Sequence, residues 1–156
     1  MEPLAAKALE IALSNLGVKE DPPGSNRGHA VDIFLRSVGL DPERGAYPWC
    51  AAFLCYCIQQ AREAIPVPLQ FKRSGRCERL VELNQALLLP RAEAGAVFVH
   101  LKPNGDGHTG FVTAVREDGS IETCEGNSDS AGSRTGGSVV RQHRAADYVN
   151  AYLRIA

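Results

Sequence analysis

Cys50 stands where a thiol readily becomes a nucleophile. It follows Pro48 and Trp49 and precedes a helix-forming run, so we expect it in the first turn of a helix that starts near Trp49 and ends at about Ala64. Pro48 prevents this helix from extending backwards. The free N–H groups and the dipole of a first turn favour a negative charge, which makes Cys50 a candidate for covalent catalysis. The plainer alternative is a small, inert core residue.

The other four cysteines lack this setting. Cys57 shares a helix face with Cys50 but lies deeper in the helix, and Cys55 points to another face, so we interpret both as structural. Cys77 and Cys124 have no comparable setting. No C-x-x-C pair occurs, so a zinc site is not predicted. An odd number of cysteines, crowded in one segment, indicates reduced thiols rather than a disulfide framework.

His108 is the candidate general base. It lies in the run GHTG that begins at Gly107, at the start of a predicted strand. The flanking glycines allow a substrate or another backbone segment to approach closely. A polar residue at a hairpin edge is the alternative interpretation. The remaining histidines are weaker rivals, because one ends a strand and two lie in loops: His100, His29 and His143.

An acceptor is needed to orient the imidazole, as in other cysteine–histidine sites. If the predicted strands 111–115 and 120–123 form a hairpin, its open end brings Glu125 beside His108. Asn127 is the second candidate, and the choice between the two stays open. A solvated loop carboxylate is the commoner role of a glutamate. The order of cysteine, histidine and acceptor along suitable elements favours the catalytic interpretation.

The elements around these residues indicate an α+β fold. Helical spacing of apolar residues predicts helices over 4–16, 31–38, 49–64 and 77–88. Short apolar runs predict strands over 96–99, 111–115, 120–123, 139–140 and 148–155. Helices followed by strands are typical of helices packed on an antiparallel sheet. The 156 residues have the size of one domain, which we expect to span residues 1–156.

Composition and the N-terminus argue against several classes of protein. A net charge of -1 gives no reason to expect nucleic-acid binding. The run from Gly105 to Gly110 matches G-x-G-x-x-G, but strand-like residues follow it, so no dinucleotide site is predicted. No metal or other cofactor is predicted. Met1–Leu4 has no basic region, and no apolar run approaches membrane-spanning length, so we expect synthesis in the cytoplasm without a signal peptide and no membrane insertion.

Together these segments resemble the CHAP domains, the cysteine, histidine-dependent amidohydrolases/peptidases related to NlpC-type cell-wall peptidases. The resemblance runs from about Val18 to Arg144. It is carried by PWCAAF from Pro48, GAVFV from Gly95, GHTGFV from Gly107, and EGN from Glu125. It implies a papain-like fold, with N-terminal helices packed on a C-terminal antiparallel β-sheet.

The resemblance also implies a role for each candidate residue. Cys50 would be the nucleophile, His108 the general base and Glu125 the orienting acid, while Asn127 falls on a polar position that supports the histidine or the substrate. We expect three neighbouring residues to contact the substrate: Tyr47, Trp49 and Gly107. The segment 41–45 carries too few acidic residues for the calcium loop of some family members.

The implied reaction is hydrolysis of N-acetylmuramoyl-L-alanine amide bonds, or of stem-peptide or cross-bridge bonds, in bacterial peptidoglycan. A phage lysin or a delivered antibacterial effector would carry out such a reaction after release or delivery to the wall. We expect a monomer that has peptidoglycan as its substrate and a delivery or immunity protein as a further partner. The alternatives are a non-catalytic wall-binding or virion-structural module, and a thiol amidase or acyltransferase that acts on another amide.

Overall fold

Helices occupy the first half of the chain and strands the second, in a computed structural model that describes residues 1–129 and 131–156. The helices are α1 (Pro3–Ser14), α2 (His29–Ser37), α3 (Cys50–Ala64) and α4 (Cys77–Leu83), followed by the short 3-10 helix η1 (Gln85–Leu87). The strands are β1 (Leu88–Leu89), β2 (Val97–Leu101), β3 (Gly107–Val115), β4 (Ile121–Ser128), β5 (Ser138–Arg144) and β6 (Ala151–Leu153), with a second 3-10 helix, η2 (Ala146–Tyr148), before β6. This arrangement confirms the predicted α+β class.

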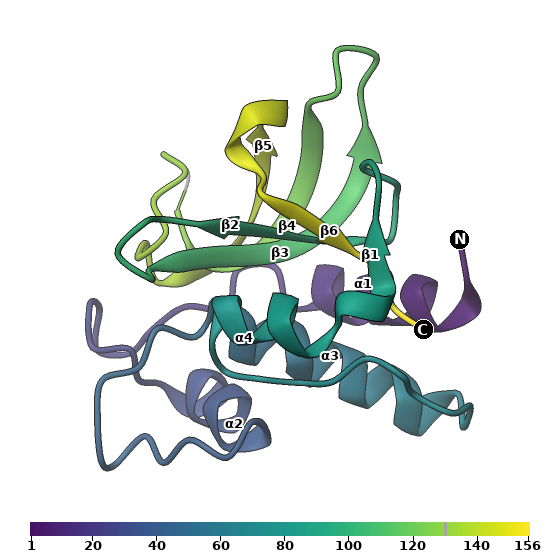
Figure 1. Ribbon diagram of the computed structural model, residues 1–156. Coiled ribbons are helices and arrows are strands. Elements are labelled where there is room, and N and C mark those ends of the chain that lie inside the picture. The colour runs from purple at the N-terminus through teal and green to yellow at the C-terminus, as the bar shows by residue number, and fades with distance from the viewer. Residues whose placement is uncertain (130) are drawn as a thin grey trace.

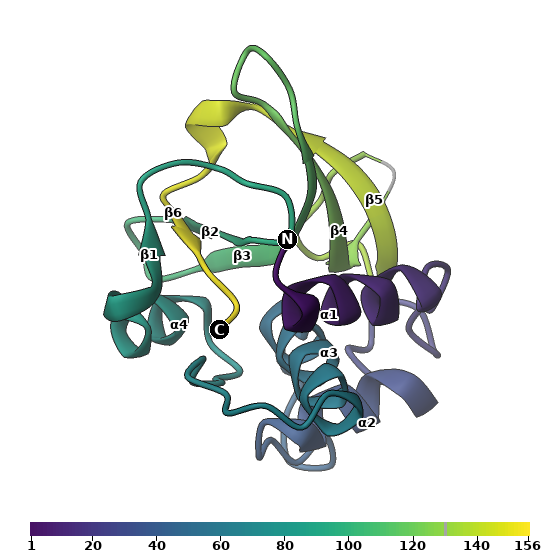
Figure 2. The same cartoon turned by 90° about the vertical axis from the view of Figure 1, so that its right-hand side faces the viewer.

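The strands form one sheet in the order β1-β6-β2-β3-β4-β5, and neighbouring strands run antiparallel. Figures 1 and 2 show all four helices on one side of this sheet. β3 and β4, which carry the candidate histidine and acceptors, are its longest strands. The first residues of β3 and the last residues of β4 therefore lie at the same end of the sheet.

α3 forms the centre of the core because it is apolar around most of its surface. Its buried residues include Phe53, Leu54 and Ile58, which are fully buried. Gly126 allows the helix to lie close to β4, since a Cβ atom there would come within 2.8 Å of the Cβ atom of Phe53. The first turn of α3, and Cys50 with it, is thereby held against the sheet.

Alternate residues of β2 face two separate apolar clusters, as strand geometry requires. Val97 and Val99 join the main core with the helices, whereas Phe98 packs with Val112 and Ile121 in a smaller cluster. That cluster is covered by the segment around η2 and β6. The sheet is thus buried on both faces along its central strands.

Several elements end at residues that differ from the sequence predictions. The fourth helix ends at Leu83 rather than Leu88, because the Asn84 side chain bonds the Leu80 carbonyl at 2.9 Å and the Lys72 backbone. β3 and β4 include the polar and glycine-rich residues 107–110 and 124–128, which the apolar patterns did not mark as strand. Within the described residues, no helix is long and apolar enough to cross a membrane.

Candidate active site

Cys50 is the first residue of α3 and follows its N-cap, Trp49. Only 4% of Cys50 is exposed. A hydrogen bond from the Cys77 thiol lowers the pKa of Cys50 most strongly, burial opposes this, and His108 and the Ala51 N–H lower it further. The net effect lowers the pKa of Cys50 well below its ordinary value, which favours the thiolate.

Trp49 lies in the core rather than on a substrate-facing surface. Its side chain is fully buried, and its indole N–H donates to the Glu20 carboxylate at 2.9 Å. Glu20 is itself held by the edge of the sheet, since its backbone N–H donates to the Gly137 carbonyl. The prediction that Trp49 contacts the substrate is therefore wrong: a fully buried indole has no surface to offer. The buried contacts of Trp49 instead fix the start of α3, where Cys50 follows directly.

His108 and Glu125 form a buried pair on adjacent strands. The His108 Nε2 atom lies 2.8 Å from Glu125 Oε2, and both side chains are fully buried. Gly110 leaves room for this contact, because a Cβ atom there would lie 2.9 Å from the Glu125 Cγ atom. Two residues separated by a tight hairpin thus meet at its open end, as the strand pairing predicts.

The other imidazole nitrogen, His108 Nδ1, has no hydrogen-bond partner among the described residues. Burial lowers the pKa of His108, but the nearby Cys50 sulfur and the bonded Glu125 carboxylate outweigh it and raise the pKa to about 9. With Nε2 held by the carboxylate, Nδ1 is the ring nitrogen that remains available. The arrangement favours an imidazolium beside the Cys50 thiolate.

Arg144 completes the site at the far side of Glu125. Its Nε and Nη2 atoms donate to the two Glu125 oxygens at 2.8 and 2.6 Å, and its guanidinium lies over the Tyr148 ring. Burial raises the pKa of Glu125, but the bonds from Arg144 and His108 reverse this and lower it to about 2. The carboxylate therefore stays charged while it holds the imidazole.

Asn127 lies near this site but does not bond to the imidazole. Its Oδ1 accepts from the Gly137 N–H at 3.3 Å, and its Nδ2 has no partner within the described chain. Its backbone has φ 55, a left-handed value that asparagine tolerates. Of the two predicted acceptors, the structure brings Glu125 and not Asn127 into contact with His108.

The two remaining predicted substrate contacts are half-buried. Tyr47 precedes the nucleophile on the approach to α3, and its ring packs over Gly45. Gly107 begins β3 beside Cys77, where a Cβ atom would lie 2.7 Å from the Cys77 Cβ. Its carbonyl accepts a bond from Arg134 at 3.4 Å. Both lie next to reactive residues in the sequence, and neither is sealed in the core.

Cys77 is a site residue that the sequence did not reveal. Its sulfur lies 3.8 Å from the Cys50 sulfur. The other three thiols differ, since burial raises the pKa of Cys55 and Cys124 to about 12 and that of Cys57 well above normal. Cys77 reaches Cys50 from another helix, so no local pattern could have indicated the contact.

The rival histidines make other contacts, although His100 pairs directly with His108 across β2 and β3. His100 stacks on the Tyr148 ring with 4.0 Å between centroids, and its Nδ1 is 2.6 Å from the Tyr148 carbonyl. His29 and His143 are exposed. None of the three holds a hydrogen bond to Glu125 within the described part of the chain.

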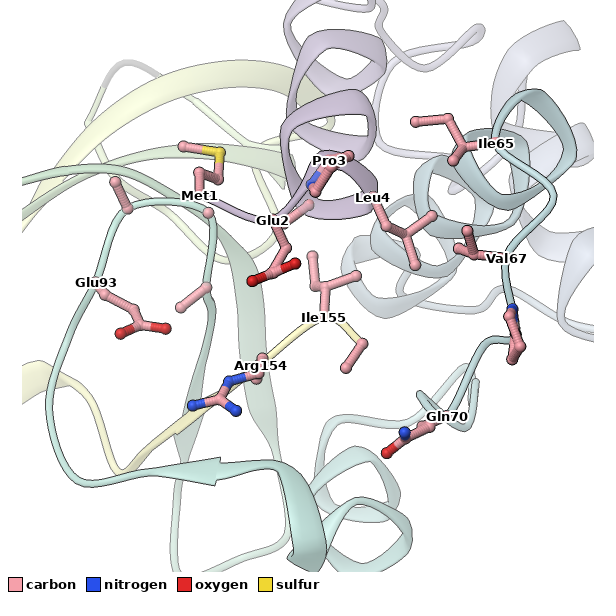
Figure 3. Close-up of a pocket in the computed structure, with 16 residues that line it drawn as sticks. Met1, Glu2, Pro3, Leu4, Ile65, Val67, Gln70, Glu93, Arg154 and Ile155 are labelled. Atoms are coloured by element: carbon pink, nitrogen blue, oxygen red, sulfur yellow. The ribbon is translucent and has the colours of Figure 1, made fainter.

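A large pocket lies elsewhere in the molecule, where the two chain ends meet. Figure 3 shows Leu4, Val67 and Ile155 in this pocket, with Glu93 and Arg154 toward one side. Its volume is about 1120 Å³, and its lining contains neither cysteine nor histidine. Cys50, His108 and Glu125 are therefore separate from this cavity.

All four candidate residues lie within a segment that matches a known protein family. The CHAP domain family matches residues 42–127, which include Cys50, His108, Glu125 and Asn127. Neither the curated proteins nor the solved structures yield a match. No cluster of three or more possible metal ligands occurs among the described residues. The chain belongs to the CHAP domain family of amidase- and peptidase-type cell-wall hydrolases, and its helices and antiparallel sheet agree with the papain-like fold of that family.

Proposed function

We propose that this protein is a cysteine hydrolase that cleaves amide bonds in bacterial peptidoglycan. The observation that carries the proposal is the buried network of His108, Glu125 and Arg144, together with Cys50 at the start of α3, whose pKa Cys77 and His108 lower. Family membership supplies the class of substrate. Buried ionisable groups are expensive to maintain, and a network that stabilises a thiolate is well suited to nucleophilic catalysis.

In the proposed mechanism, the Cys50 thiolate attacks the carbonyl carbon of the scissile amide. A carbon–sulfur bond forms and the carbonyl oxygen takes up negative charge. As the carbon–nitrogen bond breaks, His108 donates its Nδ1 proton to the leaving amine, which leaves a thioester on Cys50. The geometry supports this step because the Nδ1 atom is the imidazole nitrogen not bound to Glu125.

Hydrolysis of the thioester completes the cycle. His108, now neutral, takes a proton from water, and the resulting hydroxide adds to the thioester carbon. The carbon–sulfur bond then breaks, releasing the carboxylic acid and restoring the thiolate beside the imidazolium. Glu125 orients the ring and stabilises its charge throughout, and Arg144 keeps that carboxylate ionised.

We propose supporting roles for three further residues. Tyr47 and Gly107 flank the nucleophile and the base, and their partial exposure fits contact with the peptide portion of the substrate. Asn127 has a buried amide nitrogen without a protein partner in the described chain. Asn127 therefore supports the site from the end of β4 and does not orient the imidazole.

Peptidoglycan lies outside the cytoplasm, so we propose that the protein acts on it after release or delivery. A phage lysin and a delivered antibacterial effector both meet this requirement. We propose that the monomer is sufficient for catalysis, because Cys50, His108, Glu125 and Arg144 all come from one chain.

The experiment is digestion of purified, dye-labelled cell walls, followed by mass spectrometry of the released fragments. Cleavage at the N-acetylmuramoyl-L-alanine bond exposes the amino group of L-alanine, whereas an endopeptidase exposes an amino group within the stem or cross-bridge. We expect one of these products from the wild type and none from Cys50→Ala. Absence of fragments from folded wild-type protein, or equal release by Cys50→Ala, would contradict the proposal.

A further inference from the structure

We infer that Cys77 is a second functional thiol of the site, which supports the Cys50 thiolate in the reduced protein and closes a Cys50–Cys77 disulfide when Cys50 is oxidised. The inference rests on the proposed role of Cys50 as the nucleophile. It adds a protective and regulatory modification that the hydrolytic mechanism does not require.

The first argument is the geometry of the sulfur pair. The two sulfur atoms lie 3.8 Å apart, at the first residues of α3 and α4, and are separated by 27 positions in the sequence. Gly107 leaves room for Cys77, because a Cβ atom at position 107 would lie only 2.7 Å from the Cys77 Cβ. A disulfide requires the sulfurs to approach to about 2.05 Å. Small rotations of the two side chains can provide much of this change.

The second argument is the unequal charge of the two sulfurs. His108 and the Ala51 N–H stabilise negative charge on Cys50, in addition to the bond from Cys77. The negative charge of Cys50, burial and Glu78 oppose a charge on Cys77 and raise its pKa. The shared proton therefore remains on Cys77, which donates its S–H to the Cys50 thiolate.

The oxidative step follows from this polarity. The Cys50 thiolate attacks the terminal oxygen of a hydroperoxide, so that an S–O bond forms and the O–O bond breaks. The sulfur, oxidised by two electrons, becomes a sulfenic acid, and the alkoxide, or hydroxide from hydrogen peroxide, leaves and takes a proton from water. The Cys77 sulfur then attacks the Cys50 sulfur, and the S–O bond breaks. Hydroxide leaves with the Cys77 proton as water, so the products are the disulfide and water. A dithiol supplies two electrons and two protons to restore both thiols.

The other cysteines have no comparable partner. The Cys55 thiol donates to the Ser74 carbonyl at 3.4 Å, although Cys55 occupies the same helix as Cys50. Among the described residues, the only two sulfur atoms within hydrogen-bonding distance of each other are those of Cys50 and Cys77. The disulfide should therefore form selectively, and Cys55→Ser provides a matched control.

The test compares wild type, Cys77→Ser, Cys77→Ala and Cys55→Ser after exposure to hydrogen peroxide. Peptide mapping without reduction should show a Cys50–Cys77 disulfide in the wild type and in Cys55→Ser. In both Cys77 variants, prolonged exposure should instead take Cys50 to the sulfinic or sulfonic level. Dithiothreitol should then restore activity to wild type and Cys55→Ser but not to the Cys77 variants.

A second readout concerns the reduced protein. The pH midpoint of Cys50 alkylation should rise by about one unit in Cys77→Ala, because a hydrogen bond to a charged group is lost. Cys77→Ser should show a smaller rise, since its hydroxyl can still donate.

Two outcomes would overturn the inference: wild-type Cys50 over-oxidised without any Cys50–Cys77 linkage, or Cys77 variants that recover as fully as wild type. Failure of the proposed function is recognised separately, as a protein that forms the disulfide but releases no wall fragments.

Discussion

The two ends of α3 differ in what the protein places around them. At the first turn, Cys50 lies near enough to His108 for the two to shift each other's pKa, and His108 and Arg144 both bond Glu125, all of them nearly sealed from solvent. Beyond the last turn lies the pocket of about 1120 Å³, which exposes Glu93 and Arg154 and contains no thiol or imidazole. This cavity thus lies at the end of α3 that has neither a thiol nor an imidazole. The candidate site is therefore marked by paired buried charges and not by cavity volume.

Energetics explains why the buried groups form a chain. A charge removed from water destabilises the fold by several kcal/mol unless a partner compensates it. Glu125 accepts from Arg144 on one side and contacts His108 on the other, and Thr123 donates to it at 2.8 Å. The pocket at the other end needs no such compensation, because its charged residues face solvent.

The sharpest contrast between the two ends comes from removing the nucleophile. Cys50→Ala should reduce wall hydrolysis by about 10⁴-fold or more, because the covalent step is lost. Gln70→Ala, an exposed change in the pocket lining, should leave the rate unchanged. Both rates are measured by dye release from labelled walls. Equal losses of hydrolysis rate in the two variants would show that the two ends of α3 do not differ in their importance for catalysis.

The next contrast lies within the histidine network. His108→Ala should lower kcat by about 10³- to 10⁴-fold, because proton transfer to the amine and from water is lost. Glu125→Gln should fold and have a smaller effect, since the amide can still hold the ring but stabilises the imidazolium less. Asn127→Ala should reduce the rate least. If Asn127→Ala is the more damaging of these last two variants, Asn127 rather than Glu125 supports the imidazole.

Removal of Arg144 tests the outer end of the network. Arg144→Met leaves the buried Glu125 without its cation and should reduce the free energy of unfolding by about 3 kcal/mol. Arg141→Met, on the same strand but exposed, should change it by less than about 0.5 kcal/mol. Urea denaturation measures both.

The same pair should make stability depend on acid pH. The pKa of Glu125 is lowered to about 2, so the contribution of Glu125 to stability is present above its ordinary pKa of 4.5 and is lost as pH falls toward 2. Arg144→Met should move that loss to higher pH.

A smaller effect is expected from alkaline pH. The raised pKa of His108, about 9, means that the imidazolium persists to that pH, so kcat/KM should fall about tenfold per unit above it. The stabilising effect of the protonated ring is full below its ordinary pKa of 6.5 and is lost as pH rises through 9. Alkylation of Cys50 needs only the thiolate and should not decline there. A parallel decline in both rates would show that the fold, rather than the proton on His108, is lost.

The sequence predicts the centre of this site better than its surroundings. Cys50 and His108 begin elements marked by proline and glycine, and the hairpin geometry brings Glu125 to His108. Cys77 and Arg144 remained hidden because their contacts join separate elements, across 27 and 19 positions. Trp49 was misplaced because an aromatic residue beside a nucleophile fits both a core and a cleft, and only its bond to Glu20 separates the two.

The fold shows the same division between local and long-range information. Apolar spacing locates α1 to α3 to within about two residues, since helices are defined by nearby positions. β3 and β4 extend beyond the apolar runs because their polar ends are held by the site itself, where His108, Glu125 and Asn127 are buried. The buried polar residues of the candidate site thus interrupt the apolar pattern by which a strand is recognised.

Competitive alkylation of the five thiols tests the central claim most directly. The folded protein is treated with limiting iodoacetamide at mildly acidic pH, and the modified cysteines are identified by peptide mapping. A thiolate held by His108 at the start of α3 predicts that Cys50 is labelled first and that His108→Ala removes this preference. Preferential labelling of Cys55 or Cys57, or equal labelling of all the thiols in the folded protein, would contradict the claim that this end of α3 is the reactive centre.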